Sequence, residues 1–264
     1  MVYKMDFIEF LISAGALRFG DFTLKSGRRS PYFINAGAFD TGEKLARLGS
    51  FYAARIHDAI DAGDIPEPDT IFGPAYKGIP LAAAAAGALA RDFGVDTGYT
   101  FNRKEAKDHG EGGSFVGRQL KDGDRIVIVD DVITAGTAVR EIVPLIRAEA
   151  DVTICGLILS VDRMERGRGA LPGEAAPGNS PGGNSGGAAP GKSPGGNSGE
   201  AAPGKSPGGL SAVEEVRREL GIPVFPIVTV KDILEAAPDI VTDGRPAIDA
   251  ETKDRMARYM AEYC

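Results

Sequence analysis

The sequence lacks several features that mark common protein classes. It has no tryptophan and only two cysteines among 264 residues, and Cys264 is the last residue. Two cysteines so placed form neither a disulfide framework nor a metal site. The apolar run at residues 7–12 is short and is broken by Glu9, so it is neither a signal peptide nor a membrane span. We therefore expect a protein of the reducing cytoplasm with no membrane partner.

Positive charge is also in short supply. Lysine and arginine number 30 against 37 aspartates and glutamates, for a net charge of -7. An acidic chain is a poor candidate for a nucleic-acid binder held by bulk electrostatics, and any phosphate site must be locally basic. The length and the 43% hydrophobic content suffice for one sizeable α/β domain, or at most two small ones.

Residues 172–209 lack almost everything needed to form a core. Proline and glycine make up more than half of this segment, which repeats with a period of thirteen from 174, 187 and 200. Glycine does not recur at every third position, which excludes collagen. Such a composition buries little surface and is typical of disorder. We interpret residues 1–264 as a single domain interrupted by a disordered insertion at 172–209.

The most informative stretch is 125–138. Residues 126–129 are four apolar β-branched residues, which predict a strand buried on both faces. Asp130 and Asp131 follow, then a short loop of small and hydroxylated residues, then a helical pattern from Thr137. The stretch has neither the ending of a P-loop nor the G-x-G-x-x-G of a dinucleotide fold.

This strand–loop–helix unit suits a sugar phosphate. A helix N-terminus favours a phosphate, Gly136 permits close backbone approach, and Thr134 and Thr137 add hydroxyl donors. The two acids repel a phosphate but suit ribose hydroxyls or a cation. A bare Asp-Asp pair is equally explained by an ordinary turn with an acidic helix cap.

Four further segments carry polar groups, and each also has a plain structural interpretation. They are a basic turn at 25–29 between strands at 19–24 and 31–35, the loop 73–78 between a strand at 70–72 and a helix at 80–93, a charged loop at 103–113, and Arg163 after a strand at 152–161. The remaining predicted elements are helices at 5–17, 41–60, 137–149, 210–220 and 248–263, strands at 98–102, 115–120 and 223–230, and a short helix beginning at Lys231. Asp40 and Glu43 have the spacing of a capping box before the second helix.

Residues 125–138 resemble the 5-phosphoribosyl-1-diphosphate (PRPP) signature of the type I phosphoribosyltransferases, and 130–138 resembles its orotate branch. Residues 24–33, 73–78, 103–113 and 162–167 resemble further segments of the orotate phosphoribosyltransferases, in the same order. The resemblance covers 1–169 and 210–236. It implies an α/β fold with a mostly parallel sheet flanked by helices and a small N-terminal hood. It also implies PRPP and orotate as substrates, Mg²⁺ as cofactor, and a homodimer with shared active sites.

The resemblance assigns roles to individual residues. Those implied for PRPP are Lys25, Tyr76, Lys77, Arg103, Lys104, Lys107, His109, Asp130, Asp131, Val132, Ile133, Thr134, Ala135, Gly136, Thr137 and Ala138. Those implied for orotate are Lys25, Phe33, Ile34, Thr134 and Arg163. The catalytic set is Arg103, Lys107, His109, Asp130 and Asp131, with Mg²⁺ held mainly by the substrate. Ile34 departs from the usual pair of phenylalanines at this point of the family.

Two other functions stay open at this stage. One is a phosphoribosyltransferase for a purine or uracil, which the Lys25 segment and Arg163 disfavour. The other is a non-catalytic regulator that senses PRPP. The cations of the 103–109 loop disfavour a sensor, because a sensor has no leaving group to stabilise.

Overall fold

The protein is described here from a computed structural model covering residues 3–24, 27–104, 114–133, 136–166, 209–242 and 244–264. Its centre is a six-stranded sheet of order β5-β4-β3-β6-β7-β8, parallel except for β5. This confirms the predicted α/β class with a mostly parallel sheet. The strands of the sheet are β3 (Thr70–Phe72), β4 (Gly98–Asn102), β5 (Phe115–Gly117), β6 (Arg125–Val132), β7 (Thr153–Asp162) and β8 (Val224–Thr229).

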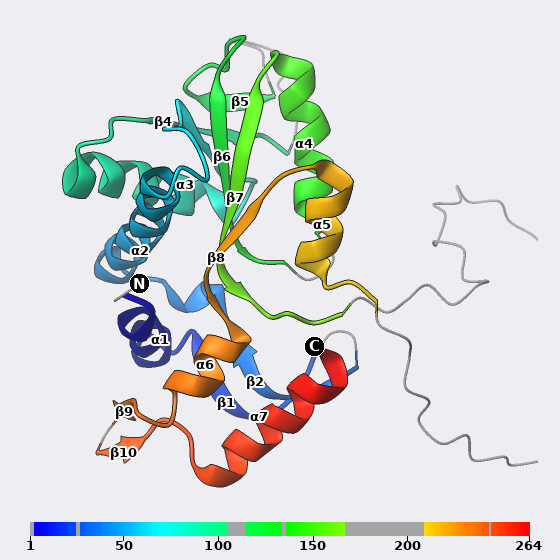
Figure 1. The fold of residues 1–264 in the computed structure, drawn as a ribbon. Coiled ribbons are helices and arrows are strands. Elements are labelled where there is room, and N and C mark those ends of the chain that lie inside the picture. Colours follow the sequence, from blue (N-terminus) through cyan, green and yellow to red (C-terminus); the bar gives the residue numbers. More distant parts are fainter. Residues whose placement is uncertain (1–2, 25–26, 105–113, 134–135, 167–208, 243) are drawn as a thin grey trace, which may run out of the picture.

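Helices cover both faces of this sheet (Figure 1). The alternation along β6 explains why: Val127 and Val129 belong to one buried cluster, and Ile126 and Ile128 to another. A parallel strand covered on both sides needs such a continuous apolar run. The first cluster includes α1 (Tyr3–Ser13), α2 (Gly42–Asp61), α3 (Gly78–Ala88), α6 (Val230–Ala236) and α7 (Ala250–Tyr263), and the second α4 (Thr137–Glu149) and α5 (Ala212–Leu220).

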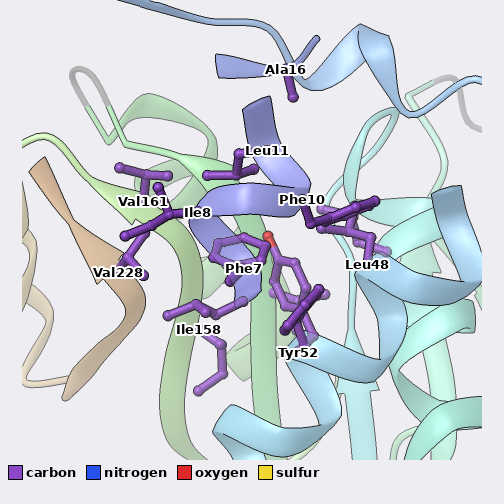
Figure 2. Packing of buried hydrophobic residues seen from close by; sticks show 14 of the residues in the cluster. Phe7, Ile8, Phe10, Leu11, Ala16, Leu48, Tyr52, Ile158, Val161 and Val228 are labelled. Atoms are coloured by element: carbon purple, nitrogen blue, oxygen red, sulfur yellow. The ribbon is translucent and has the colours of Figure 1, made fainter. Parts of the chain in front are cut away.

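The first helix anchors the larger cluster. Phe7 and Ile8 are buried among side chains of α2, β7 and β8, and the ring of Tyr52 lies in the same cluster (Figure 2). Phe7 and Phe51 have ring centroids 4.9 Å apart. Burial of such side chains is worth about 1.5–3 kcal/mol each. None of the described helices is long and apolar enough to cross a membrane.

A small second layer lies beyond one end of the sheet. It contains the antiparallel hairpin of β1 (Leu17–Thr23) and β2 (Arg29–Ile34), together with α6 and α7 (Figure 1). This part corresponds to the predicted hood. A short pair that the sequence did not predict, β9 (Val241–Thr242) and β10 (Arg245–Pro246), joins α6 to α7.

Several predicted boundaries were wrong, each for a local reason. The first helix ends at Ser13 rather than 17, because Gly15 takes a left-handed φ of 73° and Leu17 begins β1. The helix predicted at 80–93 is α3 followed by a π-type turn, η2 (Leu89–Phe93). Thr41, not Asp40, caps α2, since its hydroxyl accepts a hydrogen bond from the Lys44 backbone N–H.

Candidate functional site

The acid pair lies at the carboxyl end of β6. We expected both acids after the strand, but pairing with β7 continues through Asp130 and Val132. Two hydroxyl groups fix the backbone here. Tyr52 donates to the carbonyl of Asp130 at 2.7 Å, and Ser160 donates to the carbonyl of Asp131 at 2.6 Å. The pair is therefore held by the sheet and by two side chains from neighbouring elements.

The two carboxylates have different environments. Lys77 Nζ lies 2.7 Å from Oδ2 of Asp131, while Asp130 Oδ1 accepts a hydrogen bond from the Asp131 backbone N–H at 2.9 Å. Burial, and next the negative charge of Asp131, raise the pKa of Asp130 to about 7. A cation or a developing positive charge beside ionised Asp130 is therefore stabilised electrostatically more than it would be beside an exposed carboxylate.

The 73–78 loop closes on itself before α3. A Cβ built on Gly73 would lie 2.0 Å from the carbonyl oxygen of Gly78, and one on Gly78 would lie 2.6 Å from the carbonyl carbon of Gly73. Neither position therefore accommodates a side chain. The Ala75–Tyr76 peptide is cis, and the Ala75 N–H donates to Oδ1 of Asn102 at 2.8 Å. This loop brings Tyr76 and Lys77 to the acid pair.

The residue that caps the N-terminus of α4 is Gly136, which has a φ of 69° and provides no side-chain cap. A Cβ at Gly136 would come within 2.7 Å of Val216 Cγ2 and 2.9 Å of Arg140 Nη1, so both the backbone angle and the space require glycine. Uncapped N–H groups at a helix start suit an anion. Thr134 and Ala135 lie outside the described residues.

Arg163 follows β7 on the other side of the acid pair. Its Nε donates to the Tyr32 hydroxyl at 3.3 Å, and its Nη2 donates to Glu165 at 2.6 Å. Burial alone would lower the pKa of Arg163, but Tyr32 and Glu165 outweigh it and raise the pKa. Beside it, burial raises the pKa of Asp162.

These elements surround one cleft of about 1160 Å³. It contains polar groups from the acid pair, the 73–78 loop and the end of β7. Predicted residues that line it are Phe33, Ile34, Tyr76, Lys77, Asp130, Asp131, Val132, Ile133, Ala138 and Arg163. Lining residues that the sequence did not single out include Arg28, Asp162, Glu165 and Arg166. The charged motif 162–167 was a signal for the last three.

The remaining predicted residues fall into two groups. Some are described but do not line this cleft, and the others lie outside the described residues. Gly136 and Thr137 precede Ala138 at the start of α4. Lys104 Nζ lies over the Tyr76 ring, 5.2 Å from its centroid, and Nε of Arg103 is buried without a hydrogen-bond partner among the described residues. The predicted residues outside the described part are Lys25, Lys107, His109, Thr134 and Ala135.

The acid pair fits a divalent cation that is shared with a ligand. No group of three or more metal-ligating His, Cys, Asp or Glu side chains occurs in the described part of the chain. Mg²⁺ rarely requires one, because it is commonly bound by one or two carboxylates together with water and substrate phosphates. Asp130 and Asp131 could supply those carboxylates.

A strand end with paired acids, a helix N-terminus and a lysine-bearing loop is the arrangement of a phosphoribosyltransferase. The phosphoribosyl transferase domain family matches residues 35–169, which contain all three. An orotate phosphoribosyltransferase of Bifidobacterium adolescentis is 48% identical over 259 residues, covering 97% of this chain and 96% of its own. One from Pseudomonas putida is 47% identical and covers 94% and 95%.

A solved structure agrees with these relatives. Orotate phosphoribosyltransferase from Francisella tularensis superposes with a TM-score of 0.69 at 32% identity, over 98% of both chains. The chain belongs to the orotate phosphoribosyltransferase family. The match extends the similarity beyond residue 236, where the resemblance seen in the sequence ended.

Proposed function

We propose that this chain transfers the 5-phosphoribosyl group of PRPP to orotate, giving orotidine 5′-monophosphate and diphosphate in pyrimidine nucleotide (UMP) synthesis. The observation that carries the proposal is the cleft whose lining includes Lys77, the acid pair and Arg163. In the reaction the bond from C1 of the ribose to diphosphate breaks, and its electron pair leaves with diphosphate. A ring nitrogen of orotate bonds to C1 and loses its proton.

Asp130 and Asp131 hold the ribose hydroxyls in this proposal. As C1 becomes cationic, two fixed carboxylates stabilise the charge without reorganising, because Tyr52 and Ser160 hold their backbone. Asp130 and Asp131 would hold Mg²⁺ together with the substrate, and the ion would supply positive charge that stabilises the departing diphosphate. The raised pKa of Asp130 makes such a positive neighbour favourable.

The diphosphate is assigned to the loop at 73–78 and to the cations near it. Lys77 has 68% of its side chain exposed although its ammonium pairs with Asp131, so it can reach a phosphate. Lys25, Arg103, Lys104, Lys107 and His109 complete this set in the proposal. Thr134, Ala135, Gly136, Thr137 and Ala138 are assigned to the 5-phosphate, at the uncapped start of α4. Val132 and Ile133 are assigned to PRPP binding.

Orotate is assigned to the end of the cleft near Arg163, with Lys25, Phe33, Ile34 and Thr134. The Arg163 side chain is mostly buried, and a guanidinium fork matches a carboxylate through two parallel hydrogen bonds. Phe33 is 38% exposed, and its ring stacks on that of Phe22 with the centroids 5.5 Å apart, which leaves apolar surface for a planar base. This assignment favours orotate over uracil, which has no carboxylate.

We also propose a homodimer with shared active sites in the cytoplasm. The basis for sharing is the similarity of the 103–113 segment to a family loop that acts across the subunit interface. Cys155 and Cys264 are free thiols, as expected in a reducing compartment.

A direct assay tests the activity. Loss of orotate absorbance should depend on both PRPP and Mg²⁺, and adenine, hypoxanthine and uracil should not replace orotate. Turnover of another base in preference to orotate would refute the substrate. PRPP binding without turnover of any base would show a sensor instead of an enzyme.

A further inference from the structure

Glu165 lies at the centre of a buried polar cluster that the proposed reaction does not use directly. Its Oε1 accepts hydrogen bonds from Arg163 Nη2 at 2.6 Å, the Tyr259 hydroxyl at 2.7 Å and the Tyr32 hydroxyl at 3.3 Å. Its Oε2 lies 3.6 Å from Arg28 Nη1. Only 17% of the Glu165 side chain is exposed. The carboxylate therefore joins β2, the end of β7 and α7 at one point.

The hydrogen bonds of Arg163 occupy one edge of its guanidinium. Nε and Nη2, which form the side edge, donate to Tyr32 and Glu165. The other edge, formed by Nη1 and the second proton of Nη2, has no partner among the described residues. Arg163 lines the cleft, and an edge of this kind matches one carboxylate through two parallel hydrogen bonds.

Helix α7 holds the Glu165 carboxylate through Tyr259. The Tyr259 ring is buried and meets the Tyr32 ring edge-on at 5.8 Å. The Arg166 backbone N–H donates to the Tyr263 carbonyl at 2.8 Å. Burial and Glu165 raise the pKa of Tyr259 to about 12, so its hydroxyl stays protonated and keeps donating at neutral pH.

We propose that Glu165, supported by Tyr259 of α7, is a positioning residue that fixes the orientation of Arg163 and thereby sets the affinity for the substrate carboxylate. Orotate recognition then depends on the last helix of the chain as well as on the cleft. The inference rests on the proposed function, because Arg163 is taken as the group that meets orotate. Glu165 itself contacts no reacting atom.

The Glu165→Gln variant tests this, since it keeps the shape of the side chain and removes the charge. An amide cannot accept the same set of charge-assisted hydrogen bonds, and the side edge of Arg163 loses its ionic partner. We expect the KM for orotate to rise about tenfold or more, with kcat and the KM for PRPP within about threefold. Glu262→Gln, at an exposed site on α7, the helix that carries Tyr259, makes the same charge change and should leave all three unchanged.

Tyr259→Phe provides a second, milder variant in case Glu165→Gln does not fold. It removes one hydrogen bond to Glu165 and keeps the ring against Tyr32. We expect a rise of about two- to fivefold in the KM for orotate, the size usual for one hydrogen bond, and no change in the KM for PRPP.

Two results would overturn the inference. An unchanged or lower KM for orotate in Glu165→Gln would show that the carboxylate does not position Arg163, or competes with the substrate for it. A fall in kcat together with a rise in the KM values for both substrates and a lower thermal midpoint would show a purely structural role. Absence of orotate turnover by the unaltered protein would instead refute the proposed function, so the two failures are distinct.

Discussion

The raised pKa of Asp130 predicts an unusual pH dependence of stability. Burial and Asp131 hold this pKa at about 7, against 3.8 for an unperturbed aspartate. Between these two values the folded protein binds more protons than the unfolded chain. The ligand-free protein should therefore lose stability as pH rises through this window. This is the opposite of the effect of an ion-paired carboxylate such as Asp69, whose pKa Arg125 lowers to about 2.

The size of the effect follows from the two pKa values. A difference of about three units, at 1.36 kcal/mol each, gives at most about 4 kcal/mol in full. About 2–3 kcal/mol of it should develop between pH 5 and 7.5. Carboxylates with lowered pKa values are already ionised across that interval, so they do not contribute. For a chain of this length the change corresponds to roughly 5–10 °C in the thermal midpoint.

The measurement is the thermal midpoint of the ligand-free protein and of Asp130→Asn from pH 5 to 7.5. Asparagine has the same shape and no charge to develop, so the variant should gain stability relative to the unaltered protein as pH rises. Chemical denaturation at three pH values gives the same comparison as a free energy of unfolding. Parallel curves for the two proteins would refute the reasoning, because they would show that Asp130 ionises as easily folded as unfolded.

Four further outcomes are expected. Lys107→Ala should lower kcat about 10²–10³-fold with little effect on PRPP binding, since its contact is assigned to the transition state; turnover within threefold of the original would contradict that role. Mixing inactive Lys107→Ala with inactive Asp131→Asn should restore part of the activity in hybrid dimers, and no recovery despite proven subunit exchange would exclude shared sites. Gly136→Ala should destabilise the protein by about 1–3 kcal/mol in denaturant titrations and raise the KM for PRPP, because its φ and its contact with Val216 both exclude a Cβ; an unchanged stability would contradict this. Deleting 172–209 should leave kcat and the KM for orotate unchanged and alter stability by no more than about 1–2 kcal/mol, whereas a tenfold rise in KM at an unchanged thermal midpoint would show that the segment contacts the cleft.

Local sequence patterns were sufficient for the elements that build the centre of the cleft. The run 126–129 and the periodic apolar residues of α4 are buried as predicted. A strand covered on both faces needs a continuous apolar run, whereas a helix buried on one face needs apolar residues at intervals of three and four. The strands at 70–72 and 98–102 have the predicted bounds. Each of these elements was predictable by itself because its pattern lies within a short stretch of sequence, although the strands pair across distances such as Thr70 to Ile126.

Features that depend on distant partners were not predictable in this way. The acid pair belongs to β6 because β7 continues to pair with it, and nothing within residues 125–138 indicates where that pairing stops. The charged motif 162–167 contains Glu165, but its partners Tyr32 and Tyr259 are more than 90 positions away. The hydrogen bonds that Glu165 makes in the site therefore emerge only from the folded chain.

The bridge between Arg166 and Ser211 has a consequence for the connectivity of the fold. The residues on either side of 167–208 already meet there, and β8 pairs directly with β7. Elements after residue 209 supply side chains to both buried clusters. Packing and strand pairing therefore keep these elements in place, and their position does not depend on an unbroken backbone between 166 and 211. Residues 3–166 and 209–264 thus act as two interlocking pieces that share both buried clusters.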